Sequence, residues 1–154
     1  MKNKETGPLS LALGYLARRR RTAAEVRDLL RRSGFKQSEI EETLSYLENM
    51  RYVDDVDYAR AFIEDRETRA PCGRARLYYL LAEKGIDRAL VDRVLSELEY
   101  EELGAALRAA RNRPEWQSAS ERQRQRLYRF LLGRGFSHSV IMKVINSKED
   151  DQQD

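Results

Sequence analysis

Three glycines divide the chain into segments that share one pattern of apolar and polar positions. Gly34, Gly85 and Gly135 each follow a polar, basic stretch and precede an apolar residue, and they lie 51 and 50 residues apart. Agreement on both sides of all three glycines indicates an internal repeat. The matching upstream positions are Val26, Leu29 and Leu30, then Leu77, Leu80 and Leu81, then Leu127, Phe130 and Leu131; the downstream ones are Ile40 and Leu44, Val91 and Leu95, and Ile141 and Ile145.

The spacing of these positions is that of amphipathic helices, with one apolar stripe before and one after each glycine. Each glycine is expected to end a helix in the left-handed conformation, and the apolar residue after it should fold back onto that helix. Basic residues in the preceding turn suit the helix macrodipole; they are Arg32, Lys84 and Arg134. Thr22 and Ser38 resemble the first residues of capping boxes, although the repeat register places Lys36 at the second cap; Asp87 and Ser137 are the corresponding N-caps.

A third apolar stripe precedes each of these helix pairs, around Leu13, Phe62 and Leu107. We therefore predict an all-α fold of three tandem three-helix repeats, stacked into an elongated, curved helical array, because units of about 50 residues are marginal alone. The predicted organisation is a flexible N-terminus over 1–8, repeats over 9–52, 53–100 and 101–146, and a disordered acidic tail over 147–154.

The composition narrows the possible functions. The hydrophobic share of 41% predicts a folded chain, and the charged share of 36% favours an elongated shape with much solvated surface. One cysteine and one histidine exclude an internal disulfide and argue against a Cys/His metal or catalytic site, so we expect neither an enzyme nor a cofactor. No run approaches the roughly 18 apolar residues of a membrane span, which predicts a cytoplasmic protein without membrane contact.

Basic residues concentrate near the two ends of the chain. Residues 18–36 hold eight basic residues against two acids, and residues 104–146 hold nine against Glu115 and Glu121. Arg122, Arg126 and Arg129 share one helical face, with no acid between Glu121 and Glu149, so an anionic partner would relieve their mutual repulsion. The candidate contacts to nucleic acid or another anionic partner are Arg18, Arg19, Arg20, Arg21, Arg31, Arg32, Arg69, Arg74, Arg76, Arg122, Arg124, Arg126, Arg129 and Arg134.

Two other groups of residues have competing interpretations. Three carboxylates, which can bind metal ions, lie close together at Asp54, Asp55 and Asp57. The competing interpretation is that they mark a helix start, where carboxylates stabilise the free backbone amides. Tyr78 or Tyr79 would suit stacking on unpaired bases, whereas an amphipathic ring at the edge of a core is the simpler interpretation.

Two segments have distinctive sequences, 51–66 (RYVDDVDYARAFIEDR) and 129–136 (RFLLGRGF). They resemble the RecX family of recombination regulators: the first is similar to the family signature at the start of its middle repeat, and the second to its third-repeat motif. Between them the family has a Gly-x-x-Arg, an apolar pair and Lys-Gly-Ile, matched here by Gly73, Arg76, Leu77, Leu81, Lys84, Gly85 and Ile86. The resemblance covers about residues 9–146. Tyr78, Tyr79 and Leu80 stand at positions that are usually more polar, and Pro71 and Cys72 alter a linker that is often glycine-rich.

The resemblance implies a bacterial, cytoplasmic, non-enzymatic protein that lodges in the groove of the RecA–DNA filament. It also implies inhibition of the ATPase, strand-exchange and coprotease activities of RecA in recombination, repair and the SOS response. We expect a monomer that binds single- and double-stranded DNA weakly and without sequence preference. The alternative is a stand-alone DNA-binding protein of helix-turn-helix type, which would need an exposed recognition helix.

Overall fold

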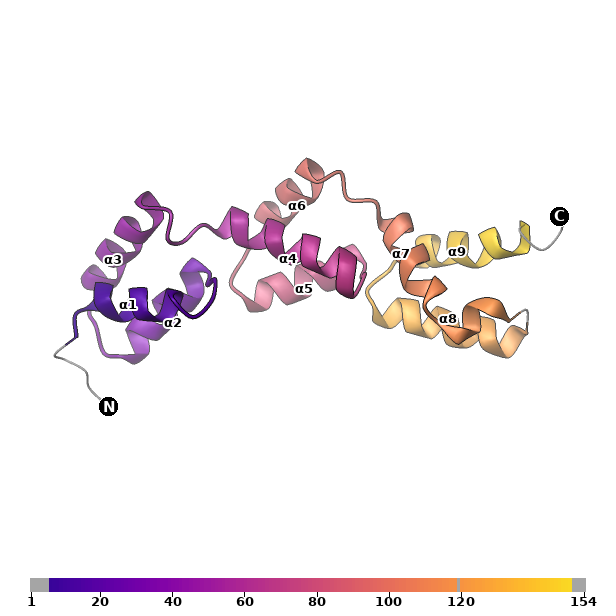
Figure 1. Cartoon of the computed structure of the whole chain (residues 1–154), viewed down its shortest axis with the longest axis horizontal. Helices are drawn as coiled ribbons and strands as arrows, with labels where there is room; N and C mark the ends of the chain where they lie inside the picture. Colours follow the sequence, from indigo (N-terminus) through magenta and orange to yellow (C-terminus); the bar gives the residue numbers. More distant parts are fainter. Residues whose placement is uncertain (1–5, 119, 151–154) are drawn as a thin grey trace.

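The computed structural model describes residues 6–118 and 120–150, and these ranges contain nine α-helices and one short 3₁₀ helix. The helices form three units in a row, with the two ends of the chain far apart (Figure 1). The predicted all-α fold of three three-helix repeats is confirmed. The units contain α1 (Pro8–Leu16), α2 (Ala23–Arg32) and α3 (Gln37–Asn49); α4 (Asp55–Arg69), α5 (Arg74–Glu83) and α6 (Arg88–Glu97); and α7 (Glu102–Arg111), η1 (Pro114–Gln117), α8 (Glu121–Gly133) and α9 (His138–Asp150).

The three repeat glycines end α2, α5 and α8 as expected. Their φ angles are 86° at Gly34, 79° at Gly85 and 83° at Gly135, the left-handed region that favours glycine. The amide of the next residue donates back to a carbonyl in the last turn of the helix. The bonds run from Phe35 to Leu30 (3.2 Å), from Ile86 to Leu81 (3.0 Å) and from Phe136 to Leu131 (3.2 Å).

Most predicted helix starts are confirmed and one is wrong. The Thr22 hydroxyl accepts from the Glu25 amide at 3.2 Å, and the Asp87 carboxylate accepts from the Leu90 amide at 2.8 Å. Ser137 likewise caps α9 through Val140. The predicted Ser38 cap is wrong, because α3 begins with Lys36 as its N-cap, whose amide donates to the Glu39 carboxylate at 2.8 Å.

The apolar residues form two separate cores. The first lies within unit 1 and includes Leu30, Leu44 and Val53, so this core reaches one residue beyond the predicted 9–52 boundary. The second runs without interruption through units 2 and 3, from Ile63 and Leu81 to Phe136. Units 2 and 3 therefore share apolar packing, whereas unit 1 has a core of its own.

Polar contacts at helix ends connect unit 1 to unit 2. The Thr22 hydroxyl donates to the carbonyl of Lys84 at 2.6 Å, and Asp55 accepts a hydrogen bond from the Ala23 amide at 2.9 Å. Gly85 lies directly against α2, because a Cβ added there would be 2.2 Å from the Ala24 Cβ. We call this set of contacts the first joint.

The second joint, between units 2 and 3, repeats the same arrangement one unit further along the chain. The Gly73 amide donates to the carbonyl of Arg134 at 2.8 Å, and Glu102 accepts from the Arg74 amide at 3.1 Å. A Cβ on Gly73 would lie 2.0 Å from the carbonyl oxygen of Gly135. In both joints, the start of the second helix of one unit meets the end of the second helix of the next.

The C-terminal end differs from the predicted disordered tail over 147–154. Helix α9 continues through residues 147–150, because the Lys148 ammonium is buried and donates to the carbonyls of Glu115 and Ser118. Its ammonium also lies 5.8 Å from the centre of the Trp116 ring. Burial, followed by the charge of Arg124, lowers the pKa of Lys148. Residues 151–154 and most of the predicted flexible N-terminus lie outside the described residues.

The glycines allow a matched test of the first joint. Gly34→Ala forces a side chain into the left-handed region but meets no atom within 4 Å, so we expect a loss of about 1–2 kcal/mol in unfolding free energy. Gly85→Ala has the same backbone penalty and also collides with Ala24, so it should lose about 1–3 kcal/mol more. Urea unfolding of both variants measures the difference; equal losses would show that the contact with Ala24 relaxes freely.

Asp55 predicts a pH dependence at the same joint. Burial is the largest influence on the pKa of Asp55 and raises it above 3.8, against the opposing hydrogen bond from Ala23. The folded state therefore binds a proton more readily, and the contribution of Asp55 to stability falls as pH rises from about 4 through the folded pKa. Asp55→Asn keeps the acceptor without the charge, so we expect its stability relative to wild type to increase between pH 4 and pH 7. Asp55→Ala should be about 1 kcal/mol less stable than Asp55→Asn at both pH values, because the Ala23 amide loses its partner. Thermal unfolding at the two pH values tests this, and a constant difference between Asn and wild type would contradict it.

Candidate functional site

Three arginines form an exposed basic face on α8, which we call the arginine ridge: Arg122, Arg126 and Arg129. The helix is fixed by the Ser120 hydroxyl, which accepts from the Gln123 amide at 3.3 Å, and by burial of its opposite side. Spacings of four and three residues place the ridge on one face, and all three side chains are exposed. Among the side chains of residues 6–118 and 120–148, none forms an ion pair or hydrogen bond with any of the three. The ridge is therefore available to an anionic partner.

Arg124 and Arg134 lie apart from this ridge. Arg124 affects the pKa of Lys148, which places its charge toward the end of α9. The Arg134 guanidinium lies 5.3 Å from the centre of the Phe130 ring, and its carbonyl accepts the hydrogen bond of the second joint. We interpret both as residues that add positive potential near the ridge while contributing to the packing of unit 3.

The four arginines after α1 have different environments. Arg18 and Arg19 are exposed, and Arg20 forms an ion pair with Asp57 of the next unit at 2.9 Å. Arg21 is packed inward: its guanidinium lies 3.9 Å from the centre of the Tyr15 ring and 3.3 Å from Glu25, and its side chain is only 13% exposed. Arg21 therefore stabilises the fold, which corrects its assignment as a contact, and Arg18 and Arg19 are the accessible pair.

Arg31 and Arg32 share a single acidic partner, Asp28. Their ion pairs to it measure 2.8 Å and 2.9 Å. The hydrogen bond from Arg31 is the largest of the influences that lower the pKa of the Asp28 carboxyl. Both guanidinium groups are exposed, and one carboxylate neutralises only part of their combined charge, so they remain candidate contacts.

The middle unit does not extend the ridge in the predicted way. Arg69 forms an ion pair with Asp65 at 3.0 Å. The Arg74 guanidinium donates to the Tyr100 carbonyl at 3.1 Å, and a Cβ on Gly135 would lie 2.6 Å from the Arg76 Cβ. Arg74 and Arg76 are thus part of the second joint, a role that depends on contacts far along the chain.

The three aspartates at the start of α4 are all engaged within the protein. The Asp54 carboxylate accepts from the Asp57 amide at 3.0 Å, Asp55 accepts from Ala23, and Asp57 pairs with Arg20. Among the described residues, no cluster of three or more His, Cys, Asp or Glu side chains is arranged to hold a metal ion. The N-cap and joint roles account for these acids.

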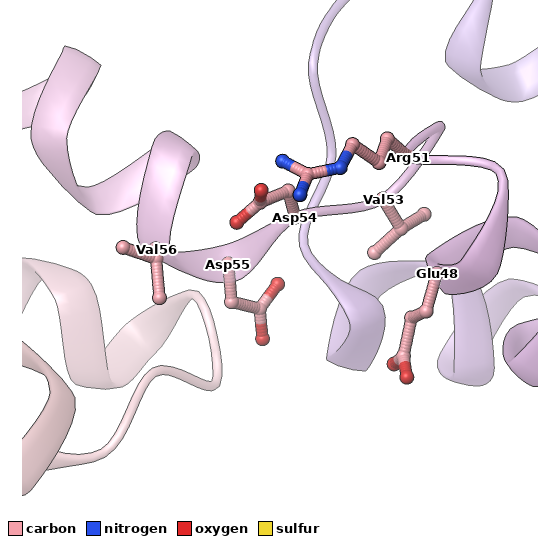
Figure 2. Close-up of a pocket in the computed structure, with 6 residues that line it drawn as sticks. All are labelled: Glu48, Arg51, Val53, Asp54, Asp55 and Val56. Atoms are coloured by element: carbon pink, nitrogen blue, oxygen red, sulfur yellow. The ribbon is translucent and has the colours of Figure 1, made fainter.

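A hollow of about 360 Å³ lies beside the linker that connects unit 1 to unit 2. Figure 2 shows the residues around it: Glu48, Arg51, Val53, Asp54, Asp55 and Val56. Arg51 has a φ of 59°, where it ends α3 and turns the chain toward α4. Because Asp54 and Asp55 already accept backbone hydrogen bonds, we interpret this hollow as the outer surface of the first joint.

The two candidate stacking tyrosines differ in exposure. The Tyr78 hydroxyl donates to Asp92, and the Arg88 guanidinium lies 4.4 Å from the centre of the Tyr78 ring. Tyr79 is 60% exposed, so it is the tyrosine that a base could reach. Three contacts were not found from the sequence: the hydrogen bonds from Lys148 to carbonyls before α8, and those accepted by the joint carboxylates of Asp55 and Glu102. Their partners are 28–33 residues away in the chain.

In the described part of the chain, no helix has the length and apolar character that crossing a membrane would require.

Comparisons with known proteins identify the same family in all three units. Three family models match in order: the first three-helix domain of RecX over 9–47, the second over 54–95 and the third over 99–145.

Relatives that match about nine-tenths of the chain are also named RecX. The chain is 32% identical to the regulatory protein RecX of Prosthecochloris aestuarii, covering 90% of this chain and 91% of that one. It is 38% identical to the regulatory protein RecX of Thermus thermophilus, covering 88% of each. A crystal structure of RecX from Lactobacillus salivarius shares the fold, with a TM-score of 0.80 at 24% identity over 92% of this chain and 94% of that one.

The free charges of the ridge predict how binding to duplex DNA depends on salt. In an Arg122→Gln/Arg126→Gln/Arg129→Gln variant, the slope of log affinity against log salt should become shallower by about 0.9 for each phosphate that the protein no longer neutralises, or about 2.7 in all. The matched control, Arg27→Gln/Arg60→Gln/Arg93→Gln, removes equal charge from arginines that pair with Glu41 and Glu97. Its slope should stay near that of wild type. Fluorescence anisotropy over a salt series measures both, and equal changes in the two variants would remove the special role of the ridge.

Proposed function

The chain belongs to the RecX family of regulatory proteins, and on that premise we propose that it binds along the groove of the RecA–DNA filament. The proposed outcome is inhibition of the ATPase, strand-exchange and coprotease activities of RecA in recombination, repair and the SOS response. The action is by occupancy, and it requires no catalytic group or cofactor on this chain. The observation that carries the proposal is the arginine ridge on α8.

The electrostatics of the ridge suit a filament built on DNA. Arg122, Arg126 and Arg129 are exposed and form no ion pair with any acid of the described residues; the charge of Arg126 only helps to lower the pKa of Glu115, whose carboxylate pairs with Arg113. DNA phosphates give the filament a strong negative potential, which draws in cationic surfaces and increases the rate of association. Contact would also relieve the repulsion among the three guanidinium groups. Binding therefore gains from both steering and charge neutralisation.

The row of units supports binding across several filament subunits. Arg18 and Arg19 lie at the end of α1 in unit 1, and the ridge lies in unit 3 near the other end of the row (Figure 1). A chain held at two separated basic sites gains effective concentration for the second contact once the first has formed. Such a bridge would occupy the groove and oppose the changes in filament geometry on which RecA activity depends.

Contact with DNA in this proposal is through phosphates, without reading of base sequence. The helices after the glycines, which would be the recognition helices, bury their central residues; examples are Leu44, Val91 and Ile141. Helix α3 in addition carries four glutamates and no basic residue, which DNA would repel. These features favour a filament regulator over a stand-alone DNA-binding protein of helix-turn-helix type.

Reversing the ridge charges tests the proposal. The Arg122→Glu/Arg126→Glu/Arg129→Glu variant should keep its helicity, because arginine and glutamate have similar helix propensities. Its affinity for preformed RecA–DNA filaments should fall about tenfold or more, and its inhibition of RecA ATPase should weaken in parallel.

The control for that experiment is Arg27→Glu/Arg60→Glu/Arg93→Glu, which changes the net charge by the same amount at ion-paired positions. It should inhibit nearly as well as wild type. ATPase titrations at two salt concentrations measure all three proteins. A folded ridge variant that inhibits as strongly as wild type at both salts would refute the role of the ridge.

A further inference from the structure

The outer surface of α3 exposes apolar side chains that the fold does not bury. Tyr46 is 45% exposed, Met50 56% and Tyr52 54%. These are three of the five large hydrophobic side chains that stand exposed in the described residues, and they lie within seven positions of one another. Tyr46 and Met50 are four residues apart and share one face of the helix.

A groove runs beside this face, between the start of α1 and α3. Its volume is about 390 Å³, and it is lined by Gly7, Pro8, Leu9, Glu39, Glu42, Thr43 and Tyr46. One wall is therefore apolar and the other carries carboxylates. The Glu39 carboxylate is already used by the Lys36 amide, whereas Glu42 has no hydrogen bond or ion pair among the described residues.

The charge of α3 is entirely negative. Its sequence QSEIEETLSYLEN contains four glutamates and no lysine or arginine. Glu41 accepts from Arg27 of α2, but Glu42 and Glu48 lack any cationic partner within the described chain. The face that contains Glu42, Tyr46 and Met50, which we call the α3 patch, thus combines exposed apolar area with an unpaired carboxylate.

The other two units show that the fold does not require this combination. Counting from the repeat glycines, Glu42 corresponds to Arg93 in unit 2 and Lys143 in unit 3, and Tyr46 corresponds to Glu97 and Ser147. In unit 2, Arg93 and Glu97 form an ion pair of 2.9 Å, so the charges on this face neutralise each other. Unit 1 has the same backbone framework with an acid and an exposed aromatic ring in place of that pair.

We propose that the α3 patch is a docking surface for a cationic segment of a protein partner. A lysine or arginine of that segment would place its aliphatic stem over the Tyr46 ring and its charged group against Glu42, and an apolar neighbour would cover Met50. The carboxylates select a basic protein segment and repel nucleic acid. The identity of the partner rests on the proposed function: the cationic segment belongs to the protein component of the RecA filament.

Both ends of the row carry accessible arginines, but unit 3 has Lys143 and Ser147 in place of Glu42 and Tyr46, so only unit 1 has the α3 patch. The arginine ridge of unit 3 contacts DNA phosphates, and the α3 patch of unit 1 contacts protein. A regulator with one contact of each kind binds its target in one direction, because turning it end for end would bring acids to phosphates and arginines to basic side chains.

The test uses the residues that unit 2 already tolerates. Glu42→Arg/Tyr46→Glu installs the Arg93–Glu97 pair of α6 at the equivalent place on α3. Its matched control is Glu64→Arg/Thr68→Glu, which makes the same change in net charge and also places an i, i+4 Arg–Glu pair on an exposed helix face, here on α4. Anisotropy of the labelled full chain is measured with RecA filaments on single-stranded DNA and with the bare DNA.

We expect the α3 variant to bind filaments about tenfold more weakly than wild type and bare DNA no more weakly, while the control matches wild type in both. Filament affinity that is unchanged in the α3 variant, or that falls equally in the control, would overturn the proposal. A second measurement separates this result from the proposed function. An acetylated peptide of alternating lysine and leucine is titrated into isotope-labelled wild-type chain and α3 variant.

The peptide should shift the amide resonances of Tyr46 and Met50 in wild type and leave those positions of the variant unshifted. If wild type fails to bind RecA filaments while the peptide still shifts these resonances, the proposed function fails and the docking surface stands. If the peptide shifts neither residue, the docking surface is overturned whether or not filaments bind.

Discussion

Each connection between units depends on a backbone carbonyl that its own helix leaves without a partner. Helix ends expose unsatisfied amides at the start and carbonyls at the end. Here the Lys84 carbonyl takes a hydrogen bond from the residue that starts α2, and the Arg134 carbonyl takes one from the residue that starts α5. A carboxylate at the first position of the next unit, Asp55 or Glu102, satisfies an adjacent amide. Each helix end thus supplies hydrogen-bond partners to the other, which requires the two backbones to approach closely. Gly85 and Gly135 therefore lie so near their neighbours that no side chain would fit.

The two joints are alike in hydrogen bonding and differ in what surrounds them. Around the second joint the apolar core is continuous, and on its unit 2 side the buried Tyr100 hydroxyl donates to the Cys72 carbonyl. Around the first joint the cores are separate, and the half-buried pair of Arg21 and Glu25 leaves one nitrogen and one oxygen without hydrogen bonds. Apolar contact resists bending and sliding over a wide area, whereas a few polar bonds hold only where their geometry is met. Units 2 and 3 therefore share one apolar core, whereas unit 1 is attached to unit 2 through a narrower, polar connection.

Local pattern was enough to predict the repeat, the glycine turns and the ridge on α8, because each depends on residues within two or three turns of one another. The arginines show where this reasoning stops. Arg122 and Arg126 are accessible as their spacing predicts, since no acid of the described residues forms an ion pair with either. From the sequence, Arg21 and Arg74 are equally available to a partner. In the structure their guanidinium groups lie over the rings of Tyr15 and Tyr100. A charge at a helix end can pair with any segment that the fold brings to it, so its availability is a property of the tertiary structure.

The ends of the row depart from the repeat where the joint no longer constrains them. Helix α1 begins with Pro8 at the position where α4 and α7 have Asp55 and Glu102, which accept from the Ala23 and Arg74 amides of the preceding unit. Gly34 faces open space instead of another helix. At the other end, α8 starts three residues earlier than the register of α2 and α5, and η1 packs beside it. Arg122 lies in the extra turn of α8, and the groove of the α3 patch opens beside Pro8. The surfaces assigned to partners thus lie at the ends of the row, where the contacts of the internal joints do not constrain the sequence.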